Sequence, residues 1–215
     1  MIKSKTDLEK KKKLGQAILR ELRKLRPDAK IALKYKNNMQ LLAAVILSAQ
    51  CTDKKVNEVT EKLFKKYKTV GDFADADIKT FEKEIYQTGF YHAKARNIIA
   101  AAKMIRKEFR GVLPKTMEEI LRLPGVARKT ANVVLGNAYG VVEGIAVDTH
   151  VKRLSKLYGL TNETDPVKIE RDLMQIIPKK DWFKFTYMLI DYGRKYCPAR
   201  AHNHIACPLT KLVLK

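Results

Sequence analysis

Apolar residues recur every three to four positions along most of the chain, which is the period of amphipathic helices. The first helix carries one such face and ends at Pro27. Its apolar face consists of Leu8, Leu14, Ile18, Leu22 and Leu25. The segment 39–50, MQLLAAVILSAQ, is apolar almost all round and therefore predicts a central, buried helix. Alternating patterns typical of strands are scarce, so the sequence predicts an all-α fold of about ten helices.

Several helix starts are marked by capping residues. Asp53 and Asp77 are expected N-caps, and Asp165 followed by Pro166 opens a further helix. Thr116 and Glu119 have the spacing of a capping box. Neither a Gly/Ser linker nor an internal repeat divides the chain, so two domains would have to be tightly docked.

The net charge of the chain indicates which class of molecule the protein binds. The 215 residues include 44 Lys and Arg against 23 Asp and Glu, a net charge of +21. Such a balance indicates a polyanion, most often nucleic acid and less often an anionic membrane. The most apolar run, 41–47, is too short to span a bilayer, and no signal-peptide core follows the charged N-terminus. We therefore expect a cytoplasmic protein, associated with the nucleoid through DNA and monomeric, without a membrane partner.

The stretch EEILRLPGVARKTANVVLGNAYG is the most informative. It predicts two helices joined by a short hairpin through Gly125 and Ala127. Backbone N–H groups at the start of the second helix would bind phosphate without regard to sequence, and Arg128 would add charge. This is a helix-hairpin-helix pattern.

Lys129 and Asp148 are the candidate catalytic residues. Lys129 falls in the first turn after the hairpin, where a lysine could act as an amine nucleophile or simply as one more phosphate ligand. Asp148 precedes a helix, where it could be an ordinary N-cap or a carboxylate that stabilises a cationic transition state. Local physics favours the phosphate-ligand role for Lys129, because lysine is abundant in this chain, and does not choose between the two roles of Asp148.

Four motifs in the right order, LLAAVILSAQCTD, GFYHAKARNI, LPGVARKTANVVL and AVDTHVKRL, resemble the endonuclease III family of DNA glycosylases. The resemblance begins at about residue 14 and runs to the C-terminus. It implies a helix-hairpin-helix glycosylase fold: a six-helix barrel over 28–142, and a second helical domain from 1–27 and 143–215. The active cleft is expected between the two domains.

The resemblance also implies an activity and roles for residues. The partner would be double-stranded DNA with damaged bases or abasic sites. The enzyme would remove oxidised pyrimidines and cleave the strand 3′ of the abasic site by β-elimination, as a bifunctional glycosylase and lyase. Lys129 would form the Schiff base, and Asp148 would stabilise positive charge on the sugar. The alternatives are a mismatch or uracil-type glycosylase of the same superfamily, or a helix-hairpin-helix DNA-binding protein without catalysis.

Further DNA contacts are expected from the same resemblance. Gln50 matches the residue that fills the space of the flipped base. Phe90 stands at the wedge position, where the family usually has leucine. Lys94 is expected at the DNA backbone or on a solvated basic face. His150 is expected to make a structural hydrogen bond or a phosphate contact. With Gly125, Ala127 and Arg128 these residues complete the predicted DNA-binding set.

The C-terminal region raises the question of a metal. The family pattern Cys-x6-Cys-x2-Cys-x5-Cys, which holds a [4Fe–4S] cluster, falls here on Cys197, His204, Cys207 and Val213. Since valine offers no ligand, the iron–sulfur cluster is expected to be absent and no cofactor is expected. Zinc is the alternative, because Cys197, His202, His204 and Cys207 include the ligand types of a Cys2His2 site. A metal-free packing loop is the favoured interpretation.

Overall fold

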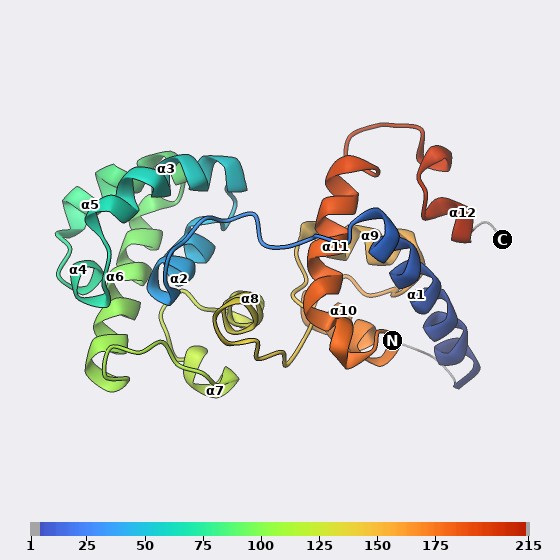
Figure 1. Ribbon diagram of the computed structural model, residues 1–215, viewed down its shortest axis with the longest axis horizontal. Coiled ribbons are helices and arrows are strands. Elements are labelled where there is room, and N and C mark those ends of the chain that lie inside the picture. Colours follow the sequence, from blue (N-terminus) through green and yellow to red (C-terminus); the bar gives the residue numbers. More distant parts are fainter. Residues whose placement is uncertain (1–4, 214–215) are drawn as a thin grey trace. The chain divides into compact units, whose positions relative to one another are not determined.

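The computed structural model describes residues 5–213, which form helices and loops without a strand. The prediction of an all-α fold is confirmed. The chain divides into two compact units, here called the continuous unit (residues 32–141) and the discontinuous unit (residues 5–31 and 142–213). Figure 1 shows both units and the order of their helices.

The continuous unit is organised around its first helix, α2. Its helical segments are α2 (Asn38–Leu47), α3 (Asp53–Lys66), α4 (Val70–Ala74), α5 (Ile78–Ile85), the 3-10 turn Tyr86–Thr88, α6 (Tyr91–Glu108), α7 (Met117–Ile120) and α8 (Arg128–Tyr139). Every residue of α2 from Met39 to Leu47 is buried, and the helix packs against α3, α6 and α8. The all-round apolar pattern of this segment therefore predicted its central position correctly.

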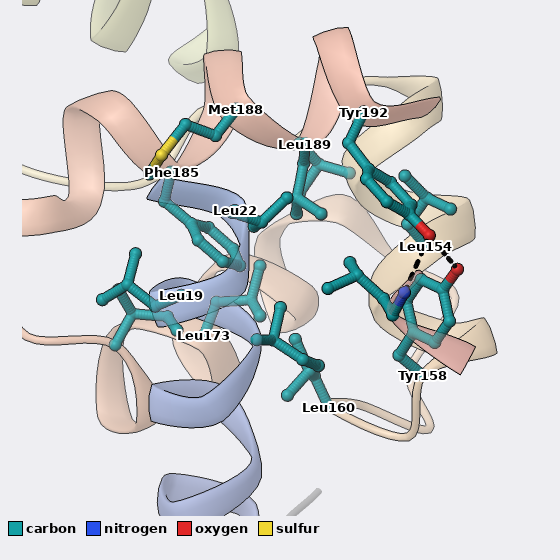
Figure 2. Close-up of a cluster of buried hydrophobic side chains, with 14 of the residues drawn as sticks. Leu19, Leu22, Leu154, Tyr158, Leu160, Leu173, Phe185, Met188, Leu189 and Tyr192 are labelled. Atoms are coloured by element: carbon teal, nitrogen blue, oxygen red, sulfur yellow. Dashed lines mark hydrogen bonds between the residues drawn. The ribbon is translucent and has the colours of Figure 1, made fainter. Parts of the chain in front are cut away.

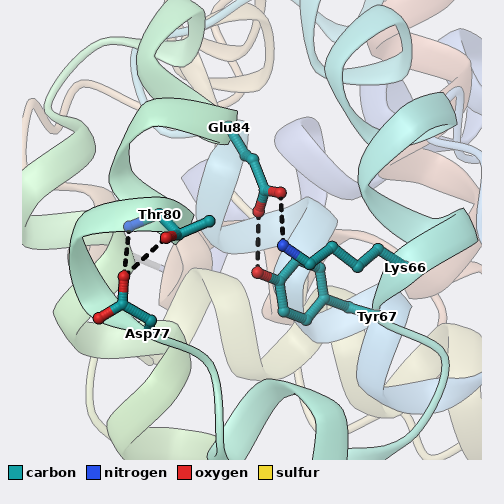
Figure 3. A network of polar contacts seen from close by, with 5 residues as sticks. All are labelled: Lys66, Tyr67, Asp77, Thr80 and Glu84. Atoms are coloured by element: carbon teal, nitrogen blue, oxygen red, sulfur yellow. Dashed lines mark hydrogen bonds and ion pairs between the residues drawn. The ribbon is translucent and has the colours of Figure 1, made fainter.

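Polar contacts fasten α3 to α5 (Figure 3). Glu84 accepts hydrogen bonds from Lys66 Nζ and from the Tyr67 hydroxyl, both at 2.8 Å. Asp77 caps α5 by accepting from the Thr80 N–H at 2.9 Å, as the sequence predicts. The predicted cap of α3 was wrong by one residue.

The N-cap of α3 is Thr52, whose Oγ1 accepts from the Lys55 N–H at 3.2 Å. Asp53 instead occupies the first position of the helix, where its negative charge still interacts favourably with the helix dipole. Both residue types are favoured at the N-cap, and here the extended backbone and the hydrogen bond of Thr52 identify it as the cap.

The discontinuous unit combines the N-terminal helix with the C-terminal third of the chain. Its helical segments are α1 (Lys5–Leu25), α9 (Thr149–Leu157), α10 (Pro166–Ile176), the 3-10 turn Lys179–Asp181, α11 (Trp182–Lys195), the 3-10 turn His204–Ala206 and α12 (Thr210–Val213). Helix α1 packs against α10 and α11. Helices α1 and α10 approach each other closely at Gly15, where a Cβ atom would lie 2.4 Å from Ile176 Cγ2.

The core of this unit joins α1 to α9, α10 and α11 (Figure 2). Leu22 and Phe185 are fully buried within it. Two buried tyrosines share a hydrogen bond, Tyr158 Oη to Tyr192 Oη at 3.0 Å, and Tyr192 Oη also accepts from the Leu209 N–H at 3.2 Å. The C-terminal segment is thereby tied to the helices. Among the described residues no helix has the length and apolar character needed to cross a membrane.

Candidate active-site residues and a candidate metal centre

The predicted hairpin connects α7 to α8 through a tight turn closed by the Val126 N–H, which donates to Leu123 O at 3.1 Å. Gly125 has φ +79°, and a Cβ atom there would lie 2.8 Å from Asn97 Cβ of α6. Only glycine satisfies both the left-handed backbone and this close approach. Ala127 has φ −92° and ψ 170°, a conformation that alanine adopts without strain, as the sequence required.

Lys129 lies in the first turn of α8 and is exposed. Arg128, the first residue of that helix, is half-buried. The N-cap residue Ala127 has no side-chain acceptor, so the first N–H groups of α8 receive no capping side chain from it. The turn therefore places an amine and a helix N-terminus on the same local surface.

Gln50 and Phe90 share an unusual backbone conformation. Their φ angles are +52° and +49°, and both residues are exposed, Phe90 at 65% of its possible surface. Left-handed conformations of non-glycine residues cost on the order of 1–3 kcal/mol and concentrate at functional sites. Two exposed, strained residues at two predicted DNA contacts are therefore a structural signal that hydrophobic patterning did not supply.

Lys94, on α6, is hydrogen-bonded to the two segments that precede these residues. It is 4% exposed, and its Nζ donates to Leu47 O at 2.8 Å and to Thr88 O at 2.7 Å. Burial holds the pKa of this ammonium below its ordinary value. Leu47 is three residues before Gln50 and Thr88 is two before Phe90, so Lys94 cross-links the two loops.

The same lysine completes the C-terminus of α2. The last four carbonyl groups of a helix lack partners within the helix. Here Ser48 N–H donates to Ala44 O, Ser48 Oγ to Val45 O, Ala49 N–H to Ile46 O, and Lys94 Nζ to Leu47 O. This buried role of Lys94 was not predicted from the sequence. Its only local signal was that Lys94 follows Phe90 by one helical turn.

Asp148 and His150 lie at the start of α9 in the discontinuous unit. Asp148 Oδ1 accepts from the Val151 N–H at 2.8 Å, so the predicted N-cap is present, and the carboxylate is half-buried. His150 is half-buried against α11, where a Cβ atom on Gly193 would lie 2.7 Å from His150 Nδ1. Because Gly193 has no side chain, the imidazole of His150 can pack directly against the backbone of α11.

Four side chains near the C-terminus form the Cys/His group: Cys197, His202, His204 and Cys207. Their ligand atoms all lie within 4.8 Å of one another. Both sulfur atoms belong to buried residues, whereas His202 is exposed and His204 is half-buried. The group has the composition and spacing to hold a metal ion, and it forms within the discontinuous unit.

The thiol of Cys207 is unlike that of a surface cysteine. Burial, and then the neighbouring Cys197, raises its pKa to about 11. The protonated Cys207 Sγ donates to Tyr196 O at 3.0 Å. A metal ion bound here would take the place of that proton.

Comparisons with known proteins agree with this fold. The model of the family described as "HhH-GPD superfamily base excision DNA repair protein" matches residues 43–179. Endonuclease III of Synechocystis sp. is 50% identical over 202 residues, which are 94% of this chain and 92% of that protein. The chain is also 42% identical, with a TM-score of 0.89 and coverage of 94% of both chains, to the solved "non-covalent Endonuclease III-DNA Complex". The same values apply to a structure described as a "Trapped Endonuclease III-DNA Covalent Intermediate".

Proposed function

The chain belongs to the HhH-GPD superfamily of base excision DNA repair proteins, and we propose that it is a DNA glycosylase and lyase of the endonuclease III type. The observation that carries the proposal is an exposed lysine in the first turn of α8, directly after the Gly125 hairpin, in a chain so similar to endonuclease III. The partner is double-stranded DNA. We expect a monomer that acts on the chromosome in the cytoplasm.

Lys129 is the proposed nucleophile. Its neutral amine attacks C1′ of a damaged pyrimidine nucleotide that has been flipped out of the duplex, and the C1′–N bond to the base breaks. Opening of the sugar ring converts the adduct into a Schiff base. Removal of a proton from C2′ then expels the 3′ phosphate by β-elimination. No metal takes part in these steps.

Asp148 is proposed to stabilise the positive charge that develops on the sugar as the base departs. Its hydrogen bond to the Val151 N–H fixes the orientation of the carboxylate. Asparagine is an equally good N-cap, so Asp148→Asn removes the charge while the cap is retained. That variant separates the two roles that the sequence left open.

DNA contacts are proposed for the hairpin and for the two strained loops. Gly125, Ala127 and Arg128 would bind phosphate at the start of α8. Gln50 would occupy the space of the flipped base and Phe90 would insert as an apolar wedge. The exposure of Gln50 and Phe90 supports these two roles.

The iron–sulfur cluster of the family does not suit this chain. The four cluster positions offer two thiols and one imidazole, while Val213 is an alkyl side chain on α12 that offers no ligand. Four thiolates normally hold such a cluster. We propose that the chain carries none, and that the reaction depends on side chains alone.

The test is borohydride reduction during reaction with a duplex that contains one abasic site. We expect a covalent protein–DNA adduct in the wild-type protein and in Lys107→Ala, an exposed lysine of α6. Lys129→Ala should give no adduct. Asp148→Asn should still bind the duplex, with glycosylase turnover reduced on the order of 100-fold or more.

The proposal fails if no adduct forms in the wild-type protein, or if Lys129→Ala forms it equally well. A panel of duplexes with oxidised pyrimidines, uracil and mismatches then defines the base that is removed. Preference for uracil or a mismatch would replace the oxidised-pyrimidine assignment while leaving the lyase chemistry intact.

A further inference from the structure

The Cys/His group has the dimensions of a mononuclear site. Zinc–sulfur and zinc–nitrogen bonds of about 2.0–2.3 Å place tetrahedral ligand atoms roughly 3.3–3.8 Å apart. Cys197 Sγ lies 3.6 Å from His204 Nδ1, and His202 Nε2 lies 3.2 Å from Cys207 Sγ. The largest separation among the four ligand atoms, at most 4.8 Å, requires a shift of only about 1 Å.

We propose that the Cys/His group binds a single zinc ion in tetrahedral coordination, as a structural site that is separate from the glycosylase chemistry. The ligands are two thiolates and two imidazoles, so the bound ion and its ligands carry no net charge. The site is closed, with no position for water, which is the arrangement of structural zinc. It stands independently of the proposed catalytic roles of Lys129 and Asp148.

Both histidines are already oriented for coordination. His202 Nδ1 lies 2.9 Å from Arg200 O, and since a carbonyl oxygen only accepts, Nδ1 carries the hydrogen and Nε2 presents a lone pair to Cys207. His204 Nε2 lies 3.2 Å from Thr210 Oγ1, which can accept its hydrogen while Nδ1 faces Cys197. Metal-bound histidines characteristically donate their second N–H in this way.

The sulfur of Cys197 has a further supporting contact. Arg153 Nη1 lies 3.7 Å from Cys197 Sγ, and Nη2 of the same guanidinium donates to Cys197 O at 2.6 Å. The guanidinium therefore holds both the backbone and the sulfur of Cys197 in place. The His204 ring stacks on Tyr158 at 5.8 Å between centroids, so the imidazole is also held from its face.

The same geometry argues against a cluster in this place. A cluster puts several metal and sulfide atoms among its ligands, which then stand farther apart than the ligands of one ion. Here the fourth ligand is His202, which does not occupy a cluster position, and it lies between Cys197 and His204 in sequence. His202, which lies outside the four cluster positions, therefore completes a site for a single metal ion.

Metal analysis of the full-length protein tests the proposal. The protein is purified without affinity metals; zinc and iron are measured by elemental mass spectrometry, and inorganic sulfide by its release in acid. We expect one zinc ion per chain and no iron above background. Replacement by cobalt should give the visible absorption of a tetrahedral cobalt site with thiolate ligands.

Matched variants identify the ligands. Cys207→Ser and His202→Ala should each lose stoichiometric zinc, whereas Cys51→Ser and His92→Ala, in the continuous unit, should retain it. Thr210→Val should weaken zinc binding about 10–100-fold by removing the partner of His204. All variants should still give the borohydride adduct when they are folded at low temperature.

Three results would overturn the proposal. The first is a brown protein that contains iron and sulfide. The second is a metal-free protein that takes up no added zinc at micromolar concentration. The third is full zinc retention in His202→Ala, which would leave at most three protein ligands.

Discussion

Replacement of Lys94 by Met tests whether this lysine is a buried cross-link or a contact to DNA. Methionine keeps much of the apolar length of the side chain but leaves Leu47 O and Thr88 O without their donor. Each buried carbonyl left without a hydrogen bond costs about 1–3 kcal/mol. Relief from burying the ammonium offsets part of the loss, so the free energy of unfolding should fall by about 2–3 kcal/mol.

Urea unfolding, followed by far-ultraviolet circular dichroism, measures this loss. Lys103→Met is the matched control, because Lys103 is exposed on the same helix α6 and its replacement changes the net charge equally. The control should remain within about 0.5 kcal/mol of wild type. Lys94→Met should also lose glycosylase activity at temperatures where it is folded, since both loops that carry Gln50 and Phe90 lose their anchor.

The outcome that refutes the cross-link is specific. If Lys94→Met matches Lys103→Met in stability but lowers the slope of log Kobs against log salt by about one, Lys94 contacts a phosphate. A stability loss with an unchanged salt slope supports the cross-link.

Three further predictions concern the DNA contacts. Phe90→Gly should raise the free energy of unfolding by up to about 1 kcal/mol, because the left-handed backbone is relaxed, while base removal slows; a stability loss in thermal unfolding would contradict this. Gly125→Ala should lower stability by about 1–3 kcal/mol and weaken binding to undamaged duplex, because its Cβ meets Asn97; fluorescence anisotropy and thermal unfolding measure both effects. Arg128→Ala should reduce the salt slope of duplex binding by about 0.9 with any DNA sequence, and an unchanged slope would remove Arg128 from the phosphate contacts.

Local signals in the sequence predicted much of the fold. The all-round apolar character of 39–50 gave the buried position of α2, and Asp77, Asp148 and Asp165 cap the helices that they were expected to cap. These features depend on residues within one or two helical turns, so each can be predicted from a single short segment of the sequence. The exception, Thr52 in place of Asp53, arose because two capable caps are adjacent.

Features that depend on distant residues were not accessible from pattern alone. Nothing near Lys94 indicates that its ammonium meets Leu47, 47 positions earlier in the chain. Likewise, the ligand types of the Cys/His group were visible, but their convergence within 4.8 Å depends on how the loop after α11 closes. The catalytic pair was identified by resemblance, and its roles remain predictions until the variants are measured.

The discontinuous unit also constrains how the chain is synthesised. Helix α1 leaves the ribosome before α10 and α11, against which Ile18 and Leu22 are buried and which lie more than a hundred residues later. At translation rates of about 5–20 residues per second, the nascent α1 waits on the order of 10 s with its apolar face uncovered. Residues 32–141 lie between α1 and its partners and can fold meanwhile, so α10 and α11 must later capture a helix that was made well before them. A ribosome that stalls before α10 would therefore release one folded unit with an exposed, basic amphipathic helix attached, a natural target for chaperones and proteases.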